Sequence, residues 1–275
     1  MGVSFVKMHG AGNDFVVLDE RAAPVHLTAA RAAAIADRHC GIGCDQIISI
    51  ARSERADAFM RILNADGSVA QACGNATRCV AMVLFQETNR SRLAIETVAG
   101  VLAAEVLASG EVEVDMGEPR LKWDEIPLAR PLDTLHLPLA GRGVSDPAAV
   151  SIGNPHATFF VADAEAVSLA ELGPRFERDP LFPERANIGF ASLCGPERMR
   201  LRVWERGAGA TRACGSGACA AVVNAHRRGI ASGRLQVQMD GGTLAVTWRT
   251  DNHLLMSGPA ARAFSGELDP AAFPP

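Results

Sequence analysis

Lysine is nearly absent from this chain of 275 residues, because only Lys7 and Lys122 occur. An enzyme that forms a Schiff base with its substrate or with pyridoxal phosphate needs a lysine amine. Neither lysine lies in a cluster of other reactive groups in the sequence. The scarcity of lysine therefore argues against lysine-based covalent chemistry, and we attribute the arginine bias to genome composition rather than to function.

Long apolar runs and a strong excess of one charge are also lacking. No run approaches the roughly 20 apolar residues of a membrane-spanning helix, and residues 1–9 lack the apolar core of a signal peptide. The net charge of −4 gives no electrostatic support for a nucleic-acid or anionic-membrane partner. The seven cysteines form no spaced disulfide framework, which indicates free thiols in a reducing compartment. We therefore expect a cytoplasmic protein that binds a small molecule.

Strand-like runs and helical patterns follow one another along the chain without regular βαβ alternation. This order favours a mixed α+β fold. The capping and spacing signals predict helices over Thr28–His39, Gly74–Thr88 and Gly215–Arg228. The most linker-like stretch is 116–119, near the middle of the chain. Strands are predicted over Val3–Val6, Phe15–Leu18, Gln46–Ile50, Ala58–Leu63, Val112–Val114, Leu135–Leu139, Ala157–Val161, Arg200–Trp204, Leu235–Met239 and Leu244–Trp248.

The tripeptide Ala-Cys-Gly occurs twice, at Ala72-Cys73-Gly74 and at Ala213-Cys214-Gly215. Each cysteine follows a strand-like run and a turn, and each precedes a predicted helix rich in small residues. The N-terminus of a helix is the positive end of its dipole, which favours the thiolate form of a cysteine. The sequence therefore predicts one activated thiol in each half of the chain.

The offset of 141 residues between the two cysteines also relates other polar positions. Beyond the cysteines the offset increases by one residue, and residues 99–103 are similar to residues 241–245. Such gap-free coincidence indicates an internal duplication. Two similar domains about a pseudo-twofold axis would bring the two cysteines face to face across a central cleft. The related pairs are Asn13 and Asn154, Gln46 and Asn187, Asn64 and Glu205, and Cys73 and Cys214.

Two opposed thiols suit the inversion of a carbon centre. If the Cα of an amino acid lies between them, one thiolate can remove its proton while the opposite thiol delivers another. The backbone N–H groups of the two helix N-termini can bind the carboxylate and stabilise the negative charge that develops on it. The helix dipoles and the nearby His156 are expected to raise the fraction of thiolate.

Seven motifs resemble those of the diaminopimelate epimerase family, in the order expected and over nearly the whole chain. Each motif alone is weak, and together they are highly specific. They are KMHGAGNDF at 7–15, GIGCDQ at 41–46, NADG at 64–67, ACGN at 72–75, GNPH at 153–156, ERGAG at 205–209 and ACGSG at 213–217.

The resemblance implies a cofactor-independent isomerase that converts LL-2,6-diaminopimelate to meso-diaminopimelate in lysine and peptidoglycan biosynthesis. It implies two pseudo-symmetric α+β domains, each a mixed or antiparallel sheet wrapped around a central helix, with the active site in the cleft between them. The expected domains are 1–118, completed by the C-terminal tail 263–275, and 119–262. Family members usually form homodimers, so a homodimer is expected here too.

By the same resemblance, Cys73 and Cys214 are the acid/base residues, with no metal and no cofactor. The reacting carboxylate would be bound by backbone N–H groups of Gly74, Asn75, Gly215 and Ser216. His156 and Glu205 would tune the pKa values of the thiols. The rest of the substrate would be held by Asn13, Gln46, Asn64, Asn154, Asn187, Glu205 and Arg206, the last two suiting a distal ammonium and a distal carboxylate respectively.

Several departures and alternatives stay open. Cys44 stands where alanine is common in the family, and its role is undecided. A zinc site at His39, Cys40 and Cys44 has unsuitable spacing, and the Gly-Ala-Gly segments lack the setting of a nucleotide loop. Two other functions remain as alternatives. One is a proline racemase or hydroxyproline epimerase of the same fold, and the other is a non-catalytic binding protein in which the two thiols act as a redox switch.

Overall fold

A computed structural model describes residues 2–70 and 73–273 of the chain. Ala72 of the first Ala-Cys-Gly tripeptide lies outside the described residues. The chain folds into two compact units, which are described separately. Unit 1 comprises residues 1–114 and 258–275, and unit 2 comprises residues 115–257.

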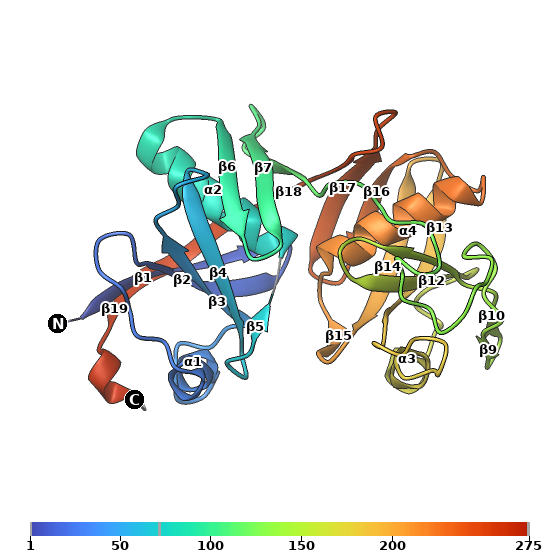
Figure 1. Ribbon diagram of the computed structural model, residues 1–275, viewed down its shortest axis with the longest axis horizontal. Coiled ribbons are helices and arrows are strands. Elements are labelled where there is room, and N and C mark those ends of the chain that lie inside the picture. The colour runs from blue at the N-terminus through green and yellow to red at the C-terminus, as the bar shows by residue number, and fades with distance from the viewer. Residues whose placement is uncertain (1, 71–72, 274–275) are drawn as a thin grey trace. The chain divides into compact units, whose positions relative to one another are not determined.

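Unit 1 is a mixed sheet with two helices, coloured blue to cyan-green in Figure 1, with the C-terminal strand in red. The second helix, α2, lies against strands of this sheet. The elements are β1 Val3–Gly10, β2 Asn13–Asp19, α1 Ala29–Ala36, β3 Gln46–Ala51, β4 Ala58–Asn64, β5 Val69–Ala70, α2 Gly74–Thr88, β6 Arg92–Thr97, β7 Gly100–Val106, β8 Val112–Asp115, β19 Ala261–Leu268 and the short 3₁₀ helix Pro270–Ala272.

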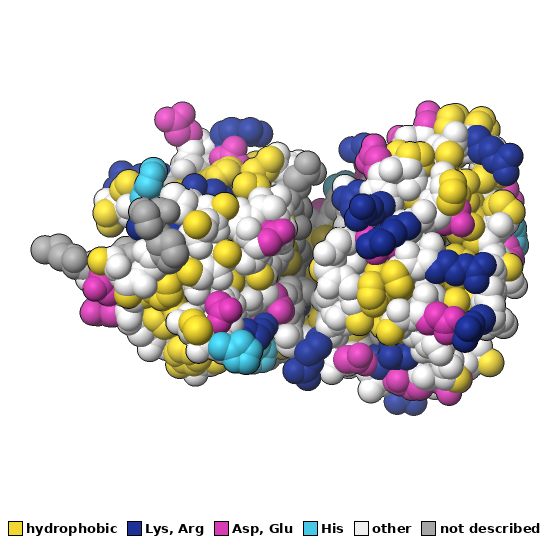
Figure 2. Space-filling view, turned by 90° about the horizontal axis from the view of Figure 1, so that it is seen from below, with side chains coloured by type: hydrophobic (Ala, Val, Ile, Leu, Met, Phe, Trp, Pro, Cys, Tyr) yellow, Lys and Arg dark blue, Asp and Glu magenta, His cyan; other side chains and the backbone are white. Residues whose placement is uncertain are grey.

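Unit 2 has the same kind of architecture, with α4 packed against its sheet and α3 beside β14. On the face seen in Figure 2, its basic and acidic side chains interleave. The elements are β9 Ala140–Gly141, β10 Val144–Ser145, β11 Ala148–Ser151, β12 Pro155–Phe160, α3 Leu169–Glu177, β13 Asn187–Gly195, β14 Arg198–Glu205, β15 Gly209–Thr211, α4 Gly215–Arg227, β16 Arg234–Met239, β17 Gly242–Trp248 and β18 Leu254–Gly258.

The strand pairing of unit 1 is repeated in unit 2. In the series β1 to β8, the pair β1–β2 is antiparallel, β2–β3 is parallel, and β3–β4 and β4–β5 are antiparallel. Strand β4 also pairs with β6, in parallel, and the pairs β6–β7 and β7–β8 are antiparallel. The strands from β11 to β18 pair in the same order and with the same directions. Each of these two series also has one helix between its second and third strands and one after its fifth strand. The predicted α+β fold with an internal duplication is confirmed.

The register of the strands repeats as well. Ile47 pairs with Leu63 in unit 1, and adding 141 to both numbers gives Ile188 and Trp204, which pair in unit 2. Beyond the second helix of each unit the offset becomes 142, as in the pairs Arg92–Glu105 and Arg234–Thr247. Unit 2 therefore has one residue more than unit 1 between the start of its second helix and the strand that follows. This extra residue accounts for the one-residue slip predicted from the sequence.

Both cysteine-linked helices begin at the residue after the cysteine. Cys73 and Cys214 are the N-cap residues, and both have extended backbone conformations with φ of −151° and −129°. The first half of each helix is almost wholly buried because its small side chains allow close approach to the sheet. Helix α2 ends at Asn89, whose φ of 54° is a left-handed conformation that asparagine tolerates better than most residues. The predicted span of α2 is confirmed, and α4 ends one residue earlier than predicted.

Two local predictions differ from the structure, and one helix was missed. Leu135–Leu139 is not a strand, because Pro138 has no N–H to donate and the segment turns so that Leu137 and Leu139 enter the core of unit 2. Helix α1 ends at Ala36 rather than near His39, because Oδ1 of Asp37 accepts the backbone N–H groups of His39 and Cys40 and so competes with the helix. Helix α3, with Pro174 inside it, was not predicted.

Candidate functional site

In unit 1, the sheet and α2 position Cys73 beside two asparagines. The hairpin between β1 and β2 turns through Ala11 and Gly12, whose φ values are positive, and places Asn13 at the start of β2. Oδ1 of Asn13 accepts from Sγ of Cys73 at 3.7 Å and from Nδ2 of Asn75 at 3.2 Å. Nδ2 of Asn13 donates to Asp45 at 2.8 Å. The structure therefore brings together Asn13, Cys73 and Asn75, three of the residues predicted from the sequence.

Gln46 and Asn64 form a second polar pair in unit 1. The register of β3 and β4 places them opposite each other, and Nε2 of Gln46 donates to Oδ1 of Asn64 at 2.9 Å. Nδ2 of Asn64 donates to Ser68 at 3.0 Å. Among the described residues, the buried Oε1 of Gln46 has no hydrogen-bond partner. A buried acceptor without a partner is costly, so this oxygen is suited to a donor on a ligand.

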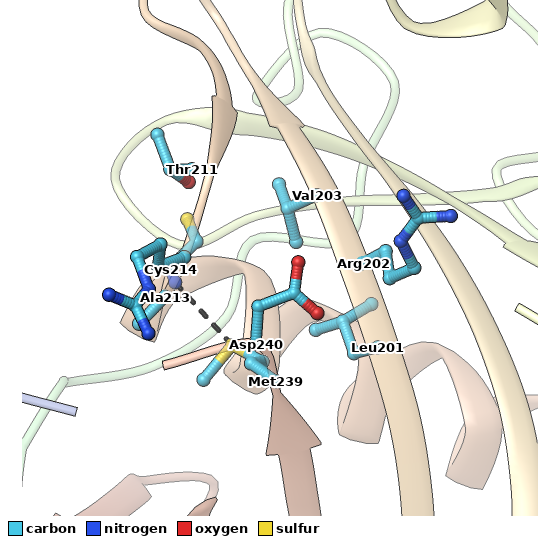
Figure 3. Close-up of a pocket in the computed structure, with 9 residues that line it drawn as sticks. Leu201, Arg202, Val203, Thr211, Ala213, Cys214, Met239 and Asp240 are labelled. Carbon is cyan, nitrogen blue, oxygen red and sulfur yellow. Dashed lines mark hydrogen bonds between the residues drawn. The ribbon is translucent and has the colours of Figure 1, made fainter. Parts of the chain in front are cut away.

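In unit 2, Cys214 is 4% exposed and its backbone N–H donates to Sδ of Met239 at 3.4 Å. Figure 3 shows this bond at a small pocket, with the cysteine sulfur on the side of Thr211. Sγ of Cys214 lies 3.6 Å from Oγ of Ser216, at the first turn of α4. Cys214 is thus more completely buried than Cys73, which is partly buried.

His156, on β12, connects the polar residues of unit 2. Its Nε2 lies 2.9 Å from Oδ1 of Asn154, 3.0 Å from Oγ of Ser216 and 3.5 Å from Nδ2 of Asn187. Asn187 is placed beside it by the parallel pairing of β12 with β13. Because Ser216 also contacts Cys214, the serine hydroxyl bridges the imidazole and the thiol.

The turn that follows β14 presents Glu205 and Arg206. Thr211 donates a short hydrogen bond to Glu205, and the backbone N–H of Arg206 donates to Oδ1 of Asn187 at 2.9 Å. The side chain of Arg206 is exposed, and its Nη1 donates to the carbonyl oxygen of Glu184 at 3.0 Å. The turn itself is held by Glu177, a buried residue at the end of α3.

The carboxylate of Glu177 accepts from Nε1 of Trp204 at 2.8 Å and from the backbone N–H of Gly207 at 3.0 Å. The two donors, Trp204 and Gly207, lie on either side of Glu205 and Arg206, which by the resemblance bind the distal end of the substrate. Sequence analysis did not single out Glu177, because one acidic residue at the end of an unpredicted helix gives no signal of its own.

The environment of Cys214 corrects the expectation that its thiol is activated by the helix dipole. Burial raises the pKa of Cys214 well above its ordinary value, and the negative charge of Glu205 raises this pKa further. Hydrogen bonds from Ser216 and from the backbone of Gly217 lower the pKa but do not compensate. Cys214 is therefore a thiol at neutral pH in the free chain, and it is suited to deliver a proton.

The expectation that His156 raises the fraction of thiolate finds no support in the charge of its ring. Burial lowers the pKa of His156 to about 3, and the nearby Arg206 lowers it further. The imidazole is therefore neutral at physiological pH and offers hydrogen bonds rather than a positive charge. Which ring nitrogen holds the proton is set by its partners, as is usual for buried histidines.

Neutral His156 predicts a specific dependence of stability on pH. Its ordinary pKa of 6.5 applies to the unfolded chain, and the folded value is about 3. The unfolded state therefore binds a proton first, and the free energy of unfolding falls as the pH drops from about 6.5 towards 3. We expect His156→Gln to flatten this part of the profile, measured as Tm against pH by circular dichroism. Equal slopes for the variant and the wild type between pH 6.5 and 4 would contradict the assignment.

The remaining cysteines lie in other environments. Burial raises the pKa of Cys44 to about 11 and that of Cys79 to about 12, so both are protonated core residues. Cys44 packs in the core cluster with Ile35 and Ile47, which supports a structural role for it. Cys40 and Cys194 are exposed, and Cys219 is buried. Lys7, which is 8% exposed, is ion-paired with Asp14 at 2.5 Å.

Comparison with known proteins identifies the family. The family model described as diaminopimelate epimerase matches residues 5–122 and 148–263. The chain belongs to the diaminopimelate epimerase family. It is 64% identical to the diaminopimelate epimerase of Acidiphilium cryptum over 98% of both chains. It is 54% identical to that of Rhodospirillum centenum, over 98% of this chain and 94% of the relative.

The fold of this diaminopimelate epimerase family member extends to more distant proteins. A hydroxyproline epimerase from Agrobacterium vitis superposes with a TM-score of 0.69 at 14% identity, covering 99% of this chain and 94% of that one. At this identity the likeness concerns the fold alone. Within residues 2–70 and 73–273, no helix is long and apolar enough to cross a membrane.

Proposed function

We propose that this protein interconverts LL- and meso-diaminopimelate by a two-base reaction that uses Cys73 and Cys214. One observation supports it most strongly: a duplicated fold carries a cysteine at the same helix N-cap in each unit, and each cysteine has its own set of polar neighbours. The family relationship at 64% and 54% identity supports the substrate. The proposal requires both half-sites to act on one substrate molecule.

The reaction proceeds by one proton removal and one proton delivery. The thiolate of one cysteine takes the Cα proton, and the electron pair left on Cα spreads into the adjacent carboxylate. Backbone N–H groups of Gly74 and Asn75 and of Gly215 and Ser216 bind that carboxylate and stabilise the added charge. The thiol of the other cysteine then delivers its proton to the opposite face of Cα. The centre is inverted and the charges of the two sulfurs are exchanged.

The distal half of the substrate distinguishes this function from its closest rival. Diaminopimelate has a second ammonium and a second carboxylate, which Glu205 and Arg206 are suited to bind. Oε1 of Gln46, which has no hydrogen-bond partner within the part of the chain that the structure describes, offers a further acceptor for an ammonium group. A proline racemase or hydroxyproline epimerase binds a compact cyclic substrate and has no use for these groups. The polar residues therefore favour a long substrate with charge at both ends.

Assembly and compartment belong to the same proposal. We place the enzyme in the cytoplasm, a reducing compartment in which cysteine thiols persist. The homodimer is inferred from the family. Light scattering of the purified protein should give twice the mass of one chain, and a monomer at micromolar concentration would contradict the dimer.

Isotope exchange tests the reaction directly. We incubate LL-diaminopimelate with the fully reduced protein in deuterated water and follow the inverted centre by NMR and mass spectrometry. Meso product should carry deuterium at the inverted Cα, because the delivered proton comes from a thiol that exchanges with solvent. Product that retains the original hydrogen would exclude the two-thiol reaction. Absence of turnover by the reduced protein would instead favour the thiol redox-switch alternative.

Trans-4-hydroxyproline and proline serve as control substrates in the same assay. The proposed function expects no detectable inversion of either compound under conditions where diaminopimelate is converted. Faster inversion of proline than of diaminopimelate would assign the protein to the rival activity.

A further inference from the structure

The largest fully buried side chain in the described part of the chain is that of Arg78, on α2, at 0% exposure. Burial of a guanidinium is costly unless its N–H groups are satisfied, so its position calls for an explanation. Nη2 of Arg78 donates to Oδ1 of Asn75 at 2.9 Å, and Nε donates to the carbonyl oxygen of Pro259 at 3.2 Å. Arg78 thereby joins α2 to the C-terminal segment that completes unit 1.

The bonds continue from Arg78 to the catalytic thiol. Arg78 bonds Asn75, Asn75 donates to Asn13 at 3.2 Å, and Asn13 accepts from Cys73 at 3.7 Å. At its other end, Asn13 donates to Asp45 at 2.8 Å. Two side-chain amides are thus held between a guanidinium and a carboxylate.

We propose that Arg78 is a positioning residue that fixes the orientation of the Asn75 amide and thereby, together with Asp45, places Asn13 against Cys73. This inference rests on the proposed function. A guanidinium can only donate hydrogen bonds, so the oxygen of the Asn75 amide must face it and the NH₂ group must face Asn13. The oxygen of Asn13 must then face Asn75 and Cys73, while its NH₂ group faces Asp45. Because Asp45 holds the Asn13 amide from its other side, the amide that could rotate by 180° without Arg78 is that of Asn75, which would then present an oxygen to Asn13 where an NH₂ group now stands.

The duplication supports a dedicated role for this arginine. Adding 141 to its number gives Cys219, a buried thiol on α4, so unit 2 has no guanidinium at the corresponding position. In the same way Asn75 corresponds to Ser216, and Phe15 corresponds to His156. Unit 2 therefore orients the neighbours of its cysteine with a neutral histidine, whereas unit 1 uses a charged arginine behind two amides.

Gly10 keeps the guanidinium in place. A Cβ at this position would lie 2.9 Å from Nη2 of Arg78 and 3.3 Å from the backbone oxygen of Asn75. Any side chain there would push against Arg78. Gly10→Ala is therefore a second way to displace the guanidinium while the charge is retained.

Arg227 on α4 provides a matched control. Its Nη1 donates to Oδ1 of Asn224, three residues earlier, at 3.3 Å, and to the carbonyl oxygen of Ala149 at 2.9 Å. Arg78 and Asn75 have the same spacing of three residues. The amide of Asn224 donates to Ala148 and Thr158, away from Cys214. Arg227→Met therefore removes a similar arginine–asparagine bond without touching the catalytic thiols.

The test combines hydrogen exchange with kinetics of the full-length protein. In ¹⁵N-labelled Arg78→Met we expect the side-chain amide protons of Asn75 to exchange with solvent roughly 10-fold faster or more, since their arrangement is no longer fixed. The same variant should lose about 10²-fold in kcat for diaminopimelate with KM changed by less than about 3-fold, because misplacement of a reacting group affects the chemical step. Arg78→Lys, which still only donates, should recover part of kcat.

The outcomes separate the positioning role from a structural one. Unchanged exchange of the Asn75 amide in Arg78→Met, or an equal loss of kcat in Arg227→Met, would overturn the proposal. If Arg78→Met does not fold, Gly10→Ala must show the same faster exchange and lower kcat, and wild-type values in that variant would also overturn it. Failure of the wild-type protein to convert diaminopimelate would reject the proposed function, while the exchange measurement would still test the orientation of the amides.

Discussion

Replacing Cys73 by alanine is expected to lower kcat/KM for LL-diaminopimelate by about 10⁴-fold, the upper end of the range for loss of a general acid or base. Cys214→Ala should cause a loss of similar size. The reason is that each direction of the reaction needs one sulfur to accept a proton and the other to deliver one. The measurement is the initial rate of formation of meso product at saturating and at limiting substrate. The double variant should be no worse than either single variant, since the two thiols act as a unit.

Cys79→Ala is the matched control for this prediction. Cys79 lies on the helix that Cys73 caps and is fully buried, and burial raises its pKa to about 12. Removing its sulfur should lower Tm through a small cavity while kcat stays within about 3-fold of the wild-type value. A Cys73→Ala protein that keeps more than a tenth of wild-type kcat would show that Cys73 is not one of the two bases.

Much of the scaffold that holds these thiols could be predicted from the sequence. The repeated Ala-Cys-Gly and the small residues after it predicted both helix starts, because a helix that packs closely on a sheet needs small side chains. The offset of 141 residues predicted the equivalence of strands β3 and β13, since the period of a strand leaves little freedom of register when one face is buried. Predictions failed where a single side chain decided the backbone, as at Pro138 and at Asp37.

The electrostatics of the site could not be predicted in the same way. A cysteine at a helix N-terminus favours thiolate, but at Cys214 burial and the charge of Glu205 raise the pKa of the thiol. His156 is neutral because the fold encloses it, which its place in a GNPH motif does not reveal. Arg78 and Glu177 act through other residues, so neither belongs to a pattern of reactive groups. The roles of these four residues depend on burial and on the direction of hydrogen bonds, and both come from the tertiary structure.

Glu205→Gln should have the second largest effect, because Glu205 has two functions in the proposal. Its charge raises the pKa of the Cys214 thiol, and its carboxylate is suited to the distal ammonium of the substrate. Loss of a hydrogen bond to a charged group costs about 1.5–3 kcal/mol, so kcat/KM for diaminopimelate should fall about 10- to 100-fold. The test compares diaminopimelate with 2-aminopimelate, which lacks the distal amine. The wild-type preference for diaminopimelate should largely disappear in the variant.

The pH profile of kcat/KM separates the two functions of Glu205. In the direction in which Cys214 delivers the proton, the alkaline limb reports its loss of that proton in the free enzyme. Removing the negative charge lowers the pKa of Cys214, so the alkaline limb should move to lower pH. Glu177→Gln is the control, since that residue holds the adjacent turn through Trp204 and Gly207 and should leave the limb unmoved. An alkaline limb that stays in place in Glu205→Gln, with substrate preference lost, would restrict Glu205 to binding and leave burial as the cause of the raised pKa.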